Sequence, residues 1–88
     1  MTYRVRLSNR AAKDLDRLNR GTQERILSRL DQLAEAPIDP RFSNLLTNRG
    51  GLRKSRVGGW RIIFSVGEES NTVDVVTIER RGQVYQRI

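Results

Sequence analysis

Cationic residues able to hold a phosphate are concentrated in the stretch LRKSRVGGWRIIF, residues 52–64. A glycine pair divides it into two runs that alternate between polar and apolar residues, which predicts a β-hairpin with a two-residue turn. In that register Arg56 lies opposite Arg61, and Lys54 shares their face. Like charges placed opposite each other destabilise a sheet, whereas arginine binds phosphate with two parallel hydrogen bonds. We therefore interpret the pair as an empty anion site; the alternative is an ordinary solvated sheet face.

The C-terminal stretch ERRGQVYQRI, residues 79–88, supplies more residues of this kind. It contains Arg80, Arg81 and Arg87 around Tyr85, and an aromatic ring among arginines is typical of sites that stack single-stranded bases and grip their phosphates. If the preceding strand pairs beside the hairpin, Arg81 and Tyr85 return over the cationic face. The alternative is a basic tail with one tyrosine packed for structural reasons.

The residue types that are missing limit the chemistry further. The 88 residues include no histidine and no cysteine, which removes the usual general base at neutral pH, thiolate metal sites and disulfides. We therefore expect neither a metal nor another cofactor, and any catalysis has to use Arg, Lys, Tyr, Ser or carboxylate groups. The net charge is +7. Residues 41–88 contain nine Lys and Arg and four Asp and Glu, a net charge of +5. This excess predicts an anionic partner, either nucleic acid or an acidic protein.

Hydrophobic periodicity predicts the elements that have to position these residues. Ser8 or Asn9 is expected to cap the first helix, and Gly21 to end it. Thr22 is expected to cap the second helix, and Pro37 stops it. A loop rich in Pro, Asn and Gly follows. The expected elements are a strand at 2–8, helices at 8–18 and 22–36, and strands at 52–57, 60–66 and 72–78.

This order predicts a single α+β domain over residues 1–88, in which two helices pack on one face of an antiparallel sheet. The other face is open and is a natural place for a ligand. The core side of the hairpin is expected to carry Ser55, Val57, Trp60, Ile62 and Phe64. No apolar run approaches the roughly 18 residues that span a bilayer, and the charged N-terminus has no signal-peptide pattern. We therefore expect a cytoplasmic protein without a membrane partner.

Three segments of the chain resemble the RelE/ParE superfamily of toxins from toxin–antitoxin pairs. They are YRVRLSNRAAKDLDRL (3–18), which resembles the opening strand and helix, LRKSRVGGWRIIFSV (52–66), which resembles the central basic segment, and ERRGQVY (79–85), which resembles the terminal Arg and Tyr segment. The resemblance implies a microbial-ribonuclease-like fold. It also implies an antitoxin partner in a toxin–antitoxin hetero-oligomer. We expect this partner to supply an acidic or amphipathic segment that covers the sheet or displaces the Tyr85 tail.

For a RelE-like member, the resemblance implies a metal-independent endoribonuclease that cleaves mRNA in the ribosomal A site. The 2′-OH would attack its own 3′ phosphate, which the arginines bind. Lys54 would be the base, Arg81 would stabilise the leaving oxygen, and Tyr85 would stack on or orient a nucleobase. The implied catalytic residues are Lys54, Arg56, Arg61, Arg81 and Tyr85, and the candidate RNA-binding residues are Arg49, Arg53, Arg80 and Arg87.

The resemblance leaves alternatives open. Leu52 stands where RelE-like enzymes commonly carry a second lysine, and Arg80 is an alternative to Arg81 for the C-terminal role. ParE-like members share the fold but inhibit DNA gyrase without catalysis. The Arg81 and Tyr85 pair favours the ribonuclease. A basic nucleic-acid-binding domain without catalysis is a third possibility.

Overall fold

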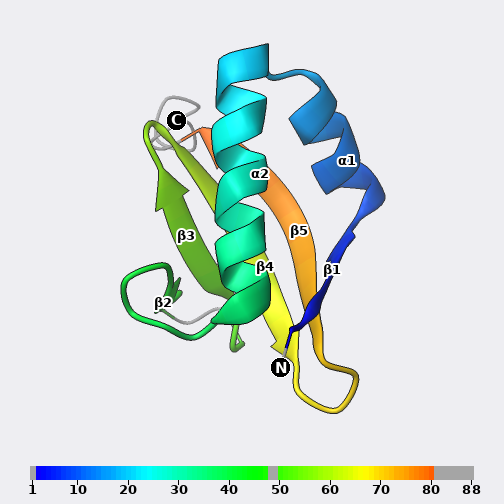
Figure 1. Ribbon diagram of the computed structural model, residues 1–88, viewed down its shortest axis with the longest axis vertical. Helices are drawn as coiled ribbons and strands as arrows, with labels where there is room; N and C mark the ends of the chain where they lie inside the picture. Colours follow the sequence, from blue (N-terminus) through cyan, green and yellow to red (C-terminus); the bar gives the residue numbers. More distant parts are fainter. Residues whose placement is uncertain (1, 48–49, 81–88) are drawn as a thin grey trace.

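The computed structural model describes residues 2–47 and 50–80. Within these ranges the chain forms two helices and one five-stranded sheet (Figure 1). The strand order in the sheet is β1-β5-β4-β3-β2. None of the helices in these ranges is long and apolar enough to cross a membrane. The elements are β1 (Arg4–Leu7), α1 (Asn9–Asp16), α2 (Arg20–Glu35), β2 (Asn44–Leu45), β3 (Arg53–Val57), β4 (Trp60–Gly67) and β5 (Thr72–Arg80).

The α+β fold with two helices on a mostly antiparallel sheet confirms the predicted class. Figure 1 shows α2 lying across one face of the sheet and α1 lying over β5. Two details differ from the prediction. First, β1 pairs with β5 in parallel, so the sheet is mixed. Second, the predicted loop contains β2, which pairs with the start of β3; a two-residue strand is too short to show a period-2 pattern.

The start of α2 also differs from the prediction. The residue that caps α2 is Asn19, whose Oδ1 accepts a hydrogen bond of 2.8 Å from the backbone N–H of Thr22. Gly21 therefore lies in the first turn of α2 rather than ending α1, and Thr22 is buried instead of capping. Asparagine is at least as good an N-cap as threonine, so the helix begins at Asn19, which was not among the predicted caps. At the start of α1 the prediction was correct, because Ser8 Oγ accepts from the N–H of Ala11.

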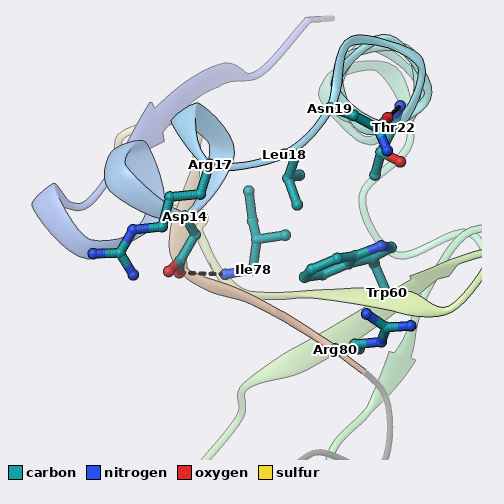
Figure 2. A pocket seen from close by; sticks show the side chains of 8 residues that line it. All are labelled: Asp14, Arg17, Leu18, Asn19, Thr22, Trp60, Ile78 and Arg80. Atoms are coloured by element: carbon teal, nitrogen blue, oxygen red, sulfur yellow. Dashed lines mark hydrogen bonds between the residues drawn. The ribbon is translucent and has the colours of Figure 1, made fainter.

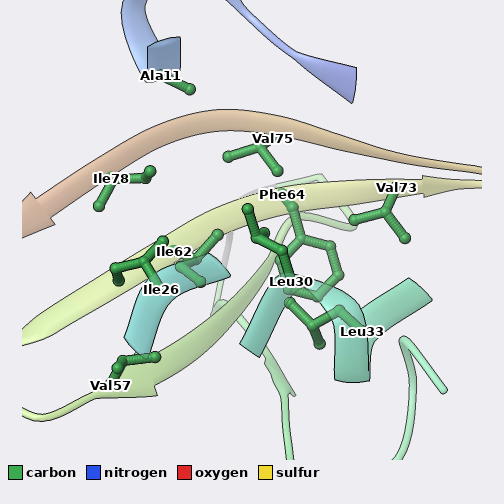
Figure 3. Close-up of a cluster of buried hydrophobic side chains, with 10 residues drawn as sticks. All are labelled: Ala11, Ile26, Leu30, Leu33, Val57, Ile62, Phe64, Val73, Val75 and Ile78. Carbon is green, nitrogen blue, oxygen red and sulfur yellow. The ribbon is translucent and has the colours of Figure 1, made fainter. Parts of the chain in front are cut away.

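The core lies between α2 and the sheet (Figure 3). Burying a large aliphatic or aromatic side chain contributes about 1.5–3 kcal/mol, so this layer fixes which sheet face is inside. Trp60, predicted to lie on this face, packs at its border and is only partly buried. The buried members are Ala11, Ile26, Leu30, Leu33, Val57, Ile62, Phe64, Val73, Val75 and Ile78.

A β-bulge in β5 decides which of its last residues face the open side of the sheet. Val76 is an extra residue in the pairing with β4, and an insertion of this kind shifts the alternation of a strand by one. Strict alternation from the buried Val75 would place Glu79 beneath the helices. Because of the bulge, Ile78 joins the core and Glu79 lies on the open face.

Side chains from the helices satisfy strand edges that β1 and β2 are too short to cover. Beyond the end of β1, Asp14 Oδ2 accepts hydrogen bonds from Ile78 N–H (3.0 Å) and Thr77 Oγ1 (2.9 Å). Beyond the end of β2, Arg29 Nη1 donates to the backbone oxygen of Arg56 (2.8 Å) and to Ser55 Oγ (2.9 Å). Unpaired strand edges otherwise invite pairing with another chain, so these bonds define the limits of the sheet.

Candidate active site on the open face of the sheet

The hairpin of β3 and β4 has the register that the sequence predicts. Arg56 pairs opposite Arg61, and Lys54 lies two pairs further from the turn, opposite Ile63. Gly58 in the turn has a φ of 60°, a left-handed conformation that glycine adopts without steric cost. The buried Ile62 lies on the α2 side, so Lys54, Arg56 and Arg61 point to the opposite, open face.

The charge conflict predicted for this hairpin is already relieved on the Arg61 side. Glu79 lies directly opposite Arg61 on β5, and Arg61 donates to its Oε2 from Nη2 (2.8 Å) and from Nε (3.1 Å). The interpretation of Arg56 and Arg61 as a pair that repels until an anion binds is therefore wrong for Arg61. The hairpin sequence could not show this, because the opposite charge is Glu79 on β5, and the bulge in β5 places Glu79 on the open face.

Arg61 and Glu79 line a shallow pocket on the open face, which we call the open-face pocket. Arg10 from the start of α1 and Lys54 from β3 also line it, and Leu52 and Ile63 form part of its apolar surface. Three cations thus surround one carboxylate. Neither Lys54 nor Arg56 forms an ion pair with any residue in the ranges 2–47 and 50–80. The face therefore keeps a positive excess that suits a phosphate.

A second basic surface adjoins the open-face pocket and shares Lys54 with it. There the guanidinium carbons of Arg41 and Arg29 lie 5.1 and 5.6 Å from the centre of the Phe42 ring, within the range of cation–π attraction. Arg56 also lines this surface. Sequence reasoning missed Arg29 and Arg41, because only the packing of α2 and the loop after it brings them to β3.

Two of the predicted RNA-binding residues lie away from the open-face pocket. Arg53 donates from Nε to Ser43 Oγ (2.9 Å) and so ties β3 to the loop that precedes β2. Arg80 pairs opposite Trp60 and lies 5.7 Å from the centre of its ring (Figure 2), on the face where α1 and α2 pack. Arg49, Arg81, Tyr85 and Arg87 lie outside the described residues.

The pocket in Figure 2 lies on the helix side of the sheet, between the two helices and the ends of β4 and β5. Asp14 points into it and holds the N–H of Ile78, and Trp60 forms another wall. Asp14 is the carboxylate among the described residues that line this pocket, and it already accepts hydrogen bonds from the backbone of Ile78 and the side chain of Thr77. Across the described ranges no three potential metal-ligating side chains cluster.

Comparison with known proteins extends these observations to nearly the whole chain. Residues 5–85 match the family model described as the ParE toxin of the type II toxin–antitoxin system parDE. No curated protein sequence matches the chain.

Solved structures of similar fold include toxins in complex with their antitoxins. An archaeal RelE–RelB complex from Pyrococcus horikoshii is 29% identical in sequence, with a TM-score of 0.80; the match covers 94% of this chain and 99% of that one. The RelBE toxin–antitoxin complex of Mycobacterium tuberculosis shares 23% identity, with a TM-score of 0.82 and coverage of 92% and 100%. A mutant Escherichia coli toxin RelE in complex with a RelB antitoxin peptide shares 23% identity, with a TM-score of 0.83 and coverage of 99% and 94%. Together with the family match, the fold and the basic open face show that this chain belongs to the RelE/ParE superfamily and is a toxin of a type II toxin–antitoxin system.

Proposed function

We propose that this toxin is a ribosome-dependent endoribonuclease that cleaves mRNA in the ribosomal A site and thereby inhibits translation. The observation that carries the proposal is the open face of the hairpin, where Lys54, Arg56 and Arg61 share one surface that the helices leave uncovered. The RelE character of the similar solved structures supports the same assignment. Such a target places the toxin in the cytoplasm.

The reaction needs groups that bind the phosphate and stabilise the charge that develops on it. Arg56 is exposed and available for this role. Arg61 is held by Glu79, yet its guanidinium has five N–H donors, and only two atoms of it bond to the carboxylate. A phosphate can therefore bind the remaining edge of Arg61. Because the groups are weak acids and bases, we expect little activity on free RNA, with positioning by the ribosome supplying the rate.

Roles for two residues beyond the described ranges complete the proposal. Arg81 stabilises the leaving 5′ oxygen, and Tyr85 stacks on or orients a nucleobase at the cut. We further propose that a cognate antitoxin blocks this surface with an acidic or amphipathic segment. The similar structures from Pyrococcus horikoshii and Mycobacterium tuberculosis are toxin–antitoxin complexes, which supports a partner of this kind.

The decisive experiment supplies purified toxin to programmed ribosomes and maps the ends of the mRNA. We expect cuts at the A-site codon, reduced at least about 100-fold in Arg81→Ala and clearly reduced in Tyr85→Ala, which removes the ring. Arg20→Ala is the control, because this arginine is exposed at the start of α2 and away from the open face. No A-site cut by the wild type, or cutting undiminished in Arg81→Ala and Tyr85→Ala, ends the ribonuclease assignment.

A second candidate is a non-enzymatic inhibitor of DNA gyrase. Two observations favour it: the matching family model carries the ParE description, and one predicted catalytic arginine, Arg61, is already bound to Glu79. A supercoiling assay separates the candidates directly. Inhibition of gyrase by toxin that leaves mRNA intact on the ribosome would establish this second function in place of the first.

A further inference from the structure

The open-face pocket contains a carboxylate that the sequence-based mechanism does not use. Of the described residues that line it, Glu79 is the acid, and it stands among Arg10, Lys54 and Arg61. We propose that Glu79 is the general base of the reaction, the group that takes the proton from the attacking 2′-OH. This inference rests on the ribonuclease function proposed above and replaces Lys54 in the role of base.

Two rows of side chains across the sheet set the geometry. In one row Arg56, Arg61 and Glu79 lie side by side on β3, β4 and β5. In the next row Lys54 lies opposite Ile63. Neighbouring strands are about 4.8 Å apart, so a phosphate bound over Arg61 lies within side-chain reach of Glu79 on one side and Arg56 on the other.

The hydrogen bonds of Glu79 leave one of its oxygens available. Both bonds from Arg61 end on Oε2, and among the hydrogen bonds of the described residues none ends on Oε1. The side chain of Glu79 is 21% exposed, so a substrate hydroxyl can reach it from the pocket. Arg61 thus fixes the orientation of the carboxylate through one oxygen while the other remains free to accept a proton.

The bulge at Val76 gives this placement a structural cause. Without the extra residue the side chain of Glu79 would point to the helix side of the sheet. The open-face pocket would then have no acidic side chain among the described residues that line it. Bulges are enriched next to active sites, where they re-aim a side chain. Here the bulge aims a carboxylate at the surface that carries the phosphate-binding cations.

The charges that face Glu79 are compatible with an anionic substrate. They come from each element around the pocket: Arg61 from β4, Lys54 from β3 and Arg10 from α1. These three cations exceed the one carboxylate, so a phosphate still meets a net positive surface. A lysine must lose its own proton before it can accept another, and its ordinary pKa is about 10.4. An ionised carboxylate needs no such step, so its basic form is available to accept a proton at neutral pH.

The proposed step conserves atoms and charge. Glu79 Oε1 accepts the 2′-OH proton as the 2′ oxygen forms a bond to phosphorus, and the bond from phosphorus to the 5′ oxygen breaks. The products are a 2′,3′-cyclic phosphate and a 5′-hydroxyl end. The leaving oxygen takes a proton from water, and Glu79 returns its proton to the solvent.

The test compares Glu79→Gln with wild type in single-turnover cleavage of mRNA on the ribosome. Glutamine keeps the shape of the side chain and can still accept a hydrogen bond from Arg61. We expect the cleavage rate to fall by at least about 100-fold, while the toxin binds the ribosome–mRNA complex as tightly as the wild type or more tightly, because a negative charge is removed from the pocket. Glu69→Gln is the matched control, since Glu69 is an exposed glutamate in the turn between β4 and β5.

If Glu79 only neutralises Arg61, the cleavage rate of Glu79→Gln should equal that of the wild type. If Glu79→Gln binds more tightly and cleaves as fast as the wild type, the general-base proposal is overturned while the ribonuclease function stands. If the wild-type toxin makes no A-site cut, both fall.

The pH dependence gives a second readout: the wild-type rate should drop at acid pH as a carboxylate is protonated, and Glu79→Gln should lose that drop. An unchanged acid limb in the variant also overturns the proposal. Circular dichroism verifies that each variant is folded.

Discussion

The ion pair between Arg61 and Glu79 predicts that two neighbouring arginines of the hairpin respond differently to removal. Arg56 is exposed and has no acidic partner among the described residues, so Arg56→Ala should leave stability unchanged or slightly raised by removing repulsion. Arg61→Ala should instead destabilise the protein, because it leaves a partly buried carboxylate without its main hydrogen-bond donor. The hairpin register alone predicts unchanged or raised stability for both substitutions, because each removes one side of the same repulsion.

The size of the effect follows from how exposed the pair is. A fully exposed ion pair contributes about 0.2–1 kcal/mol, and removing one partner of a buried pair costs about 3–5 kcal/mol. The side chains of Arg61 and Glu79 are 27% and 21% exposed, between these limits. We therefore expect a coupling free energy of about 1–2 kcal/mol. For a domain of this size, a variant that loses this much stability should melt roughly 5–15 °C below the wild type.

The two single variants should not be equal. After Glu79→Ala, Arg61 lies opposite Arg56 with no counter-charge beside it, which adds a repulsion of about 0.2–1 kcal/mol. After Arg61→Ala, Glu79 still shares its pocket with Lys54 and Arg10. Glu79→Ala should therefore cost more than Arg61→Ala.

A double-mutant cycle measures the coupling. Urea unfolding, followed by circular dichroism, gives the free energy of unfolding for wild type, Arg61→Ala, Glu79→Ala and the double variant. The pair Arg20–Glu24 is the control, since its side chains are 91% and 72% exposed and 3.9 Å apart; its coupling should be at most about 0.5 kcal/mol. If the coupling of Arg61 and Glu79 does not exceed that of the control, the structural basis for both the corrected charge assignment and the orientation of Glu79 is refuted.

Two further predictions concern the edge of the sheet. Asp14→Ala removes the acceptor of two hydrogen bonds from β5 and should lower the free energy of unfolding by about 2–3 kcal/mol; Asp16→Ala, an exposed neighbour on the same helix, should change it by less than about 0.5 kcal/mol, and equal effects of the two would contradict this role of Asp14. The hydrogen bond from Arg6 lowers the pKa of Asp74, so its contribution to stability is present above the unfolded pKa of about 3.9 and is lost as the pH falls through the lower folded value. The urea midpoint should therefore fall less between pH 6 and about pH 3 in Asp74→Asn than in wild type. An equal fall in the two proteins would argue against this linkage.

The parts of this protein that the sequence predicts correctly depend on neighbours along the chain. The hairpin with Arg56 opposite Arg61 follows from a glycine pair and period-2 alternation, and both are local signals. The helix that covers the sheet follows from the apolar spacing of Ile26, Leu30 and Leu33. The resemblance of three segments to the RelE/ParE superfamily is likewise a property of the sequence, and the family match confirms it.

Tertiary structure decided the features that join residues far apart in the chain. Arg61 meets Glu79 eighteen positions away, and a bulge cannot be read from a strand whose alternation it interrupts. Arg29 reaches Arg56 only because α2 packs over β3. The chemistry of the open face depends on these contacts: the sequence by itself determined a cationic hairpin, whereas the pairing of β4 with a bulged β5 placed a carboxylate among its charges. Local patterns determine which elements form, but the register between elements fixes which charges meet, because it is set by packing over the whole sheet.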